Sequence, residues 1–142
     1  MINDALKMTG HLAISINNEV VCEVPNLVVL DGKEYVASRM KDTTKAAMSH
    51  MAIGTSSTAA AASNSALGAQ TDRQTLTSTT VSSNSITYVA TFSAGEGTGA
   101  ITEAGLFNAS GSAGDMLCRT VFPVINKGAN DSCTITWSVT VS

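Results

Sequence analysis

The clearest pattern of polar and apolar positions lies at the end of the chain. Apolar residues occupy every second position there: Cys133, Ile135, Trp137, Val139 and Val141. Small hydroxyl residues stand between them: Thr134, Thr136, Ser138 and Thr140. A period of two among β-branched and aromatic residues predicts a strand with one buried face. Solvated strands usually carry charges on the other face, so we expect Thr134, Thr136 and Thr140 to contact another surface, such as a second subunit.

Similar patterns recur along most of the chain. They predict strands over residues 11–17, 20–24, 48–53, 73–81, 86–93, 100–108, 115–124 and 132–141. Asn17 and Asn18 fit a hairpin turn between the first two strands. The spacing of the strands after residue 73 predicts a mainly β protein, an antiparallel sandwich or jelly roll. The length is typical of one domain, so we expect residues 1–142 to form a single β-sandwich domain.

One short helix is predicted over residues 33–41. Asp31 is expected to cap its N-terminus, with Glu34 at the third helical position, as in a capping box. Val36 and Met40 then share one side of the helix. Residues 55–68 (TSSTAAAASNSALG) lack bulky side chains and predict an ordered surface loop with a helical turn at the alanines, with disorder as the alternative.

The composition narrows the classes of partner. Hydrophobic residues make up 44% of the chain, charged residues only 13%, and the net charge is −3. Without a basic stripe, no direct contact with nucleic acid is expected. No apolar run approaches the roughly 20 residues that cross a bilayer, and the N-terminal residues do not fit a secretion signal. A surface so low in charge favours packed protein contacts, so we expect a homo-oligomer.

The chain lacks the residue clusters that most catalytic sites need. The cysteines Cys22, Cys118 and Cys133 lie far apart in predicted strands, which favours buried free thiols over disulfides. Residues 94–99 (AGEGTG) match neither a P-loop nor a dinucleotide-binding turn and fit a loop between strands. We therefore expect no enzyme activity, metal or cofactor.

Two polar residues stand out within apolar strands. His50, between two methionines, fits a partly buried strand residue, with a soft-metal site as the alternative. Glu103 lies in an otherwise neutral strand. We expect Glu103 to accept hydrogen bonds from backbone N–H groups at a bend, or to form a structural ion pair with Arg73 or Arg119, with direct contact to a partner as the alternative.

Four longer segments resemble one family of proteins. They are NLVVLDGKEYVASRM (26–40), MSHMAIGTSSTAA (48–60), ITYVATFSAGEGTGAITEAGLFNAS (86–110) and RTVFPVINKGANDSCTITWSVTVS (119–142). Together they resemble small virion proteins of tailed bacteriophages, namely the head decoration, or cement, proteins of short-tailed phages. The ordered series 52–54, 103–108 and 126–128 carries the strongest part of the likeness. Residues 101–111 also resemble the first domain of some tail-fibre proteins.

This resemblance implies a jelly-roll-like structural protein on the outside of an icosahedral capsid. Its partner would be the major capsid protein, whose neighbouring subunits it would staple as a dimer or trimer. It would be located in the virion, and in the host cytoplasm during assembly. The resemblance assigns no contact residues. From the residues themselves we expect an extended N-terminal arm over residues 1–9 that becomes ordered on the capsid surface, with Leu6 and Met8 as anchors. Glu103, Thr134, Thr136 and Thr140 complete the expected interface. A tail-fibre or baseplate adaptor and a carbohydrate-binding sandwich remain as alternatives.

Overall fold

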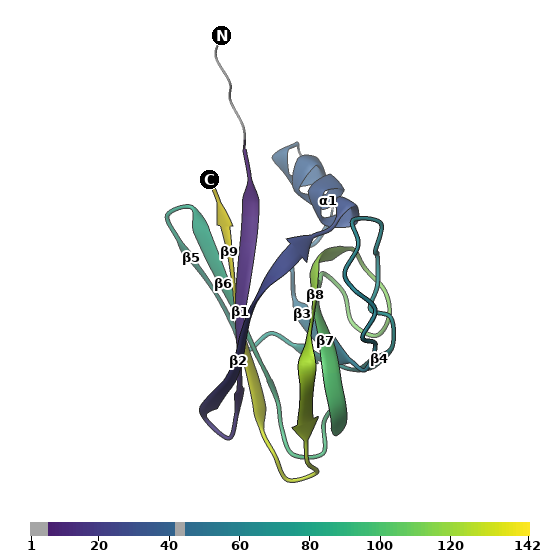
Figure 1. Ribbon diagram of the computed structural model, residues 1–142. Helices are drawn as coiled ribbons and strands as arrows, with labels where there is room; N and C mark the ends of the chain where they lie inside the picture. Colours follow the sequence, from purple (N-terminus) through teal and green to yellow (C-terminus); the bar gives the residue numbers. More distant parts are fainter. Residues whose placement is uncertain (1–5, 42–44) are drawn as a thin grey trace.

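The structure, a computed structural model, describes residues 6–41 and 45–142 of the chain. The described part forms nine strands and one helix, arranged as an antiparallel β-sandwich (Figure 1). The elements are β1 (Met8–Ile16), β2 (Glu19–Val28), α1 (Leu30–Met40), β3 (His50–Gly54), β4 (Gln70–Thr75), β5 (Ser78–Ser82), β6 (Ser85–Phe92), β7 (Gly99–Phe107), β8 (Met116–Lys127) and β9 (Cys133–Val141). The predicted fold class is confirmed.

Strand β2 belongs to both layers of the sandwich. Its first part pairs with β1, and its last two residues, Leu27 and Val28, pair with β8. Sheet A therefore has the order β2-β1-β9-β6-β5, and sheet B has the order β4-β3-β7-β8-β2. The predicted turn at Asn17 and Asn18 joins β1 to β2, and both residues have positive φ angles, 50° and 69°. Asparagine adopts this left-handed conformation more readily than most residues, which suits a two-residue hairpin turn.

The hydrophobic core fills the space between the two sheets. Four of the five predicted inward positions of the last strand, Cys133, Ile135, Trp137 and Val139, are buried, and the fifth, Val141, is partly buried. The inward side of β6 is also as predicted: Ile86 is partly buried, and Tyr88, Ala90 and Phe92 are buried. Each buried Leu, Ile or Phe side chain contributes about 1.5–3 kcal/mol relative to exposure. This alternation therefore fixes which face of each strand points into the sandwich.

Helix α1 begins earlier than predicted and has a different N-terminus. It starts at Leu30 after an N-cap, Val29, whose side chain makes no capping hydrogen bond. The predicted Asp31 cap is wrong, because the Asp31 carboxylate accepts a hydrogen bond from the backbone N–H of Met116 at 2.7 Å. Gly32 lies so close to the backbone of Leu117 that a Cβ atom would clash with it. The helix start is thus set by packing on β8 rather than by a local capping box.

The predicted strand over residues 73–81 is two strands. β4 lies at the edge of sheet B and β5 at the edge of sheet A, so the chain crosses between the layers at Leu76 and Thr77. The Leu76 N–H donates to Ser49 O, and the Thr77 N–H donates to Val89 O. Residues 55–69 contain no helix or strand, in agreement with the predicted loop.

The N-terminal arm predicted over residues 1–9 is wrong for the last of these residues. Met8 and Thr9 belong to β1 and pair with Val141 and Thr140 of β9, and residues 1–5 lie outside the described part. Lys7 extends this pairing, because its backbone exchanges two hydrogen bonds with Ser142. Among the described helices, none is long and apolar enough to cross a membrane.

Candidate functional site

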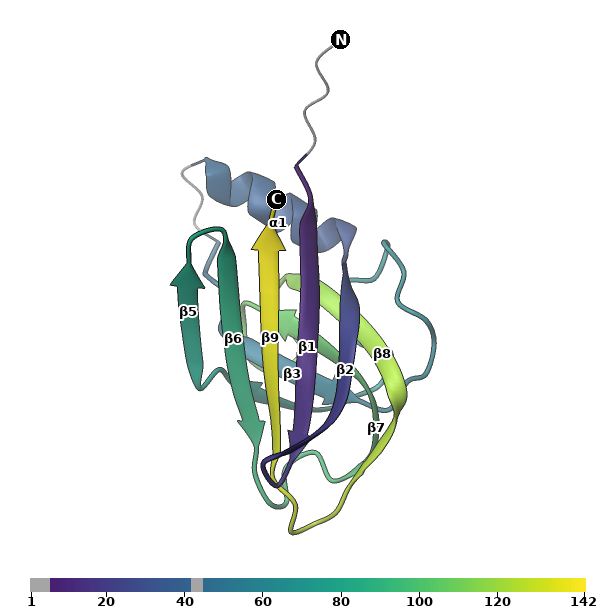
Figure 2. The same cartoon turned by 60° about the vertical axis from the view of Figure 1, so that its left-hand side comes forward.

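The outer face of sheet A, which points away from sheet B, is the candidate functional site (Figure 2). Its central strands are β1, β9 and β6. Their outward residues are Thr9, His11, Ala13 and Ser15 on β1, Thr134, Thr136, Ser138 and Thr140 on β9, and Ser85, Thr87, Val89 and Thr91 on β6. The only ionisable side chain among these belongs to His11. The expected uncharged face of the last strand is thus part of a larger surface that is nearly free of charge across β1, β9 and β6, with Glu23 of β2 at its border.

The hydroxyl groups of this face hydrogen-bond to one another between β6 and β9. The pairs are Ser85–Thr140 at 2.7 Å, Thr91–Thr134 at 3.1 Å and Thr87–Ser138 at 3.3 Å. A polar group that already has a partner costs less to bury than one that loses its water without compensation. Sheet A can therefore be covered by another protein surface without desolvating an ion on its central strands.

The structure brings together three of the predicted interface residues and separates the others from them. Thr134, Thr136 and Thr140 lie in one row, with Thr136 exposed at the middle of the sheet. Leu6 and Met8 instead line an apolar groove of about 300 Å³, together with Lys33, Val36, Ala37 and Met40 of α1. Leu6 is 73% exposed, whereas Met8 packs partly against the core. The groove is a second surface and not an extension of the sheet face.

The prediction of Glu103 as an interface residue needs correction, because the side chain is 0% exposed. Its Oε2 atom accepts hydrogen bonds from the backbone N–H groups of Ser56 at 2.9 Å and Ala69 at 2.8 Å. Its Oε1 atom accepts one from the Gly68 N–H at 2.8 Å and lies 3.0 Å from Arg119 Nη2. The expected ion pair with Arg119 is confirmed, and the loop over residues 55–69 covers both charges.

Arg119 ties the same loop down at further points. Its guanidinium donates to Thr58 O and to Asn64 Oδ1, both at 3.0 Å. Arg73, the other expected partner of Glu103, stacks over the Phe107 ring at 3.6 Å and donates to Ala113 O. The two arginines thus fix two different loops on the outside of sheet B.

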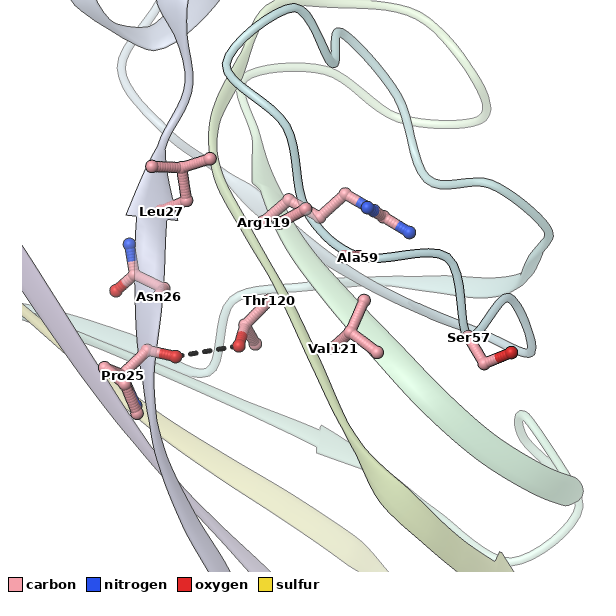
Figure 3. A pocket seen from close by; sticks show the side chains of 9 residues that line it. Pro25, Asn26, Leu27, Ser57, Ala59, Arg119, Thr120 and Val121 are labelled. Carbon is pink, nitrogen blue, oxygen red and sulfur yellow. Dashed lines mark hydrogen bonds between the residues drawn. The ribbon is translucent and has the colours of Figure 1, made fainter.

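Arg119 also separates two small cavities beside the loop. The first, about 350 Å³, is drawn in Figure 3, where Thr120 donates to the Pro25 carbonyl at 2.8 Å. The second, about 450 Å³, is lined by residues of the loop itself. Arg119 is the one charged residue that lines either cavity, and its donors already bind Glu103 and the loop. The described residues bring no nucleophile and base together in these cavities.

His50 is a partly buried strand residue, as predicted. Its Nδ1 atom lies 2.8 Å from Ser49 Oγ, and burial, together with the positive charge of Arg73, lowers its pKa. Met51, the next residue, points to the opposite side of β3 and lies in the core. Within residues 6–41 and 45–142, no group of three or more His, Cys, Asp or Glu side chains could hold a metal ion.

The three cysteines are free, as predicted. Cys118 and Cys133 are buried, and Cys22 is partly exposed. Burial raises the pKa of the Cys133 thiol to about 11 and that of Cys118 well above its usual value. A buried thiol that stays protonated is a poor nucleophile and a poor metal ligand, so these two residues serve packing.

Sequence reasoning placed only one strand of the candidate face. The outward residues of β1 and β6 carry the same signal, since Ala13, Ser15, Thr87 and Thr91 alternate with apolar residues. This alternation does not reveal the order of the strands in the sheet, in which β9 lies between β1 and β6. Comparison of the chain with protein-family models, with curated proteins and with solved structures finds no match. Any functional proposal therefore rests on the geometry of the chain and on the resemblance of its segments.

Proposed function

We propose that the protein is a structural virion protein that binds the exterior of a bacteriophage capsid through the outer face of sheet A. The observation that carries this proposal is the nearly complete lack of ionisable side chains on the three central strands of that face. Free monomers usually keep mixed charges on such a surface for solubility. A face of paired hydroxyls and small apolar groups is suited to permanent contact with another protein.

The size of the face matches this role. Strands β1, β9, β6 and β5 have 9, 9, 8 and 5 residues. With about 4.8 Å between strands and about 3.3 Å per residue, their outer face covers about 500 Å². A stable interface buries about 800 Å² on each partner, so the face provides most of one contact. The partner would be the major capsid protein. Many copies on one shell would then bridge neighbouring subunits and reinforce the lattice together.

The alternative, a tail-fibre or baseplate adaptor, depends on the resemblance of residues 101–111. Seven of these residues, Ile101–Phe107, are buried in β7. A buried strand reflects packing within the fold and does not select an external partner. We therefore propose the capsid as the first partner, and the tail as the second candidate.

The test is co-sedimentation of the purified protein with empty, expanded capsids. We expect saturable binding at a stoichiometry that matches the capsid lattice. Thr136→Lys places a charge at the centre of the face and should weaken binding about tenfold or more, because the interface would bury an unpaired ion. Ser112→Lys, in the exposed β7–β8 loop, adds the same charge elsewhere and should bind normally.

Three results would contradict this proposal. Absence of binding to capsids, with recovery on isolated tails, would favour the adaptor. Equal binding by wild type and Thr136→Lys would move the contact away from sheet A. Equal loss in Thr136→Lys and Ser112→Lys would show that the effect comes from net charge rather than from the face.

A further inference from the structure

Strand β5 forms an open edge of sheet A. It pairs with β6 on one side, and no described strand pairs with its other side. All of its residues, Ser78–Ser82, are exposed, and Val81 is 70% exposed. The outer N–H and C=O groups of an edge strand are unpaired, so an unprotected edge is a template for another strand.

The other open edges carry features that prevent such pairing. The first half of β2 has Glu19 and Glu23, and its register shifts at a bulge opposite β1. β4 has Asp72 and Arg73, and the free half of β8 has Pro123, which lacks an N–H. Charges, bulges and prolines are the usual protection of edges. β5, with the sequence STTVS, has none of these features.

The sequence of β5 is also nearly symmetric about Thr80. Ser82 and Ser85 flank the two-residue turn of the β5–β6 hairpin, so they form a hydrogen-bonded pair. In an antiparallel pair every second residue makes backbone hydrogen bonds to the neighbouring strand. The backbone N–H and C=O groups of Thr80 therefore also point towards β6. The backbone groups of Thr79 and Val81 consequently point to the open edge, at equal distances along the strand from Thr80.

We propose that β5 pairs with β5 of a second copy, antiparallel and centred on Thr80, to give a two-fold dimer. In this register Thr79 faces Val81 of the other copy, and the two residues exchange both backbone hydrogen bonds. The same exchange occurs on the far side of the axis, because a two-fold interface repeats each contact. Val81 then packs across the interface instead of remaining exposed.

In this dimer the outer face of sheet A in one copy continues into the same face of the other copy. Ser78, Thr80 and Ser82 point outward, as their partners Val89, Thr87 and Ser85 on β6 do. Two copies would therefore present one surface of about 1,000 Å², formed by β1, β9, β6 and β5 of each copy, on which His11 is the only ionisable residue type. Only this last consequence bears on capsid binding, and the dimer itself does not depend on the proposed function.

The experiment is sedimentation velocity of the full chain, without capsids, over a wide range of concentration. We expect a monomer–dimer equilibrium. Val81→Pro removes an outward N–H while leaving the bonds to β6, and should weaken dimerisation about tenfold or more. Thr80→Lys and Thr80→Glu should each weaken it by placing like charges opposite each other at the axis. An equimolar mixture of these two variants should recover dimerisation as a heterodimer.

The mixing experiment separates loss of the contact from loss of folding, because misfolded variants would not recover on mixing. A wild type that is monomeric at every concentration would overturn the proposal. A trimer would also overturn it, since pairing of one edge closes at two copies. A dimer that Val81→Pro and both Thr80 variants leave unchanged would place the interface elsewhere.

Discussion

The carboxylate of Glu103 and the guanidinium of Arg119 meet at 3.0 Å, with side chains 0% and 2% exposed. Both side chains also bind the loop over residues 55–69, mostly through its backbone and, from Arg119, through the side chain of Asn64. That loop is rich in Ser, Thr and Ala and has little apolar bulk of its own. The buried ion pair therefore takes the place of a hydrophobic contact in holding the loop against sheet B.

The first prediction concerns this pair. Arg119→Met should lower the free energy of unfolding by about 3–5 kcal/mol, because it leaves a buried carboxylate without its counter-charge. The double variant Glu103→Gln/Arg119→Met should cost less than the sum of the two single variants. Urea denaturation measures all three. Lys45→Met, which breaks the more exposed pair with Asp115, is the control and should cost about 1 kcal/mol or less. Additive single effects would show that the buried charges are not coupled.

The second prediction concerns the only tryptophan. Trp137 Nε1 donates to Asn26 Oδ1 at 2.9 Å, and a Cβ atom on Gly10 would clash with that same oxygen. Trp137→Phe should cost about 1–3 kcal/mol, since the Asn26 oxygen loses its partner. Gly10→Ala should destabilise the wild type by displacing Asn26. It should cost clearly less in the Trp137→Phe background, and equal costs in both backgrounds would contradict this mechanism.

The third prediction is a pH dependence at the ends of two hairpins. The Asp131 carboxylate accepts hydrogen bonds from the Asn17 side chain at 2.9 Å and the Gly128 N–H at 2.7 Å, which lower its pKa below 3.8. A carboxylate with a lowered pKa adds stability above its unfolded value, and that stability is lost as pH falls through the folded value. Relative to Asp131→Asn, the wild type should therefore keep a constant advantage near neutral pH and lose it below 3.8.

Urea midpoints for wild type and Asp131→Asn, compared from neutral to acidic pH, measure this loss. Asn17→Ala removes the hydrogen bond that lowers the pKa of Asp131 most. It should therefore reduce the difference in urea midpoint between proteins with Asp and with Asn at position 131. A difference that grows as the pH falls would have the wrong sign for a lowered pKa.

The fourth prediction concerns the thiols. At mildly alkaline pH, Cys22 should react first with a thiol reagent because it is partly exposed, although burial and Glu23 raise its pKa. Cys118 and Cys133 should react only on unfolding, since burial keeps both thiols protonated. Cys22→Ser should abolish the fast phase. A fast phase that persists in this variant would reveal local opening of the core.

The strands that could be predicted best are those with one face in the core and one outside. β6 and β9 alternate cleanly because their outward residues are small and polar while their inward residues are large and apolar. At Leu76 and Thr77, where the chain crosses between the sheets, the pattern of polar and apolar residues shows no comparable change. Threonine is common on both sides of this break, so residues 73–81 look like one strand although they belong to two sheets.

The candidate site could be predicted only in part. The residue types on each strand follow from the local sequence, whereas the strand pairing that brings them together does not. The row on β9 follows from alternation, but its neighbours on β1 come from the other end of the chain, where Thr9 pairs with Thr140. The choice of Arg119 over Arg73 for Glu103 depends on the β7–β8 register, which sets Arg119 opposite Gly105. Asp31 was misplaced for the same reason, since its partner Met116 is distant in sequence.

The central position of β1 and β9 in sheet A sets the order of events during synthesis. These neighbours are the first and last of the described strands, so their pairing spans almost the whole chain. A nascent chain must wait for β9 to leave the ribosome before β1 and β6 gain their shared neighbour. Folds that depend on such distant contacts form slowly. The growing polypeptide is therefore most exposed to aggregation just before β9 emerges, when β1 and β6 both have unpaired backbone groups.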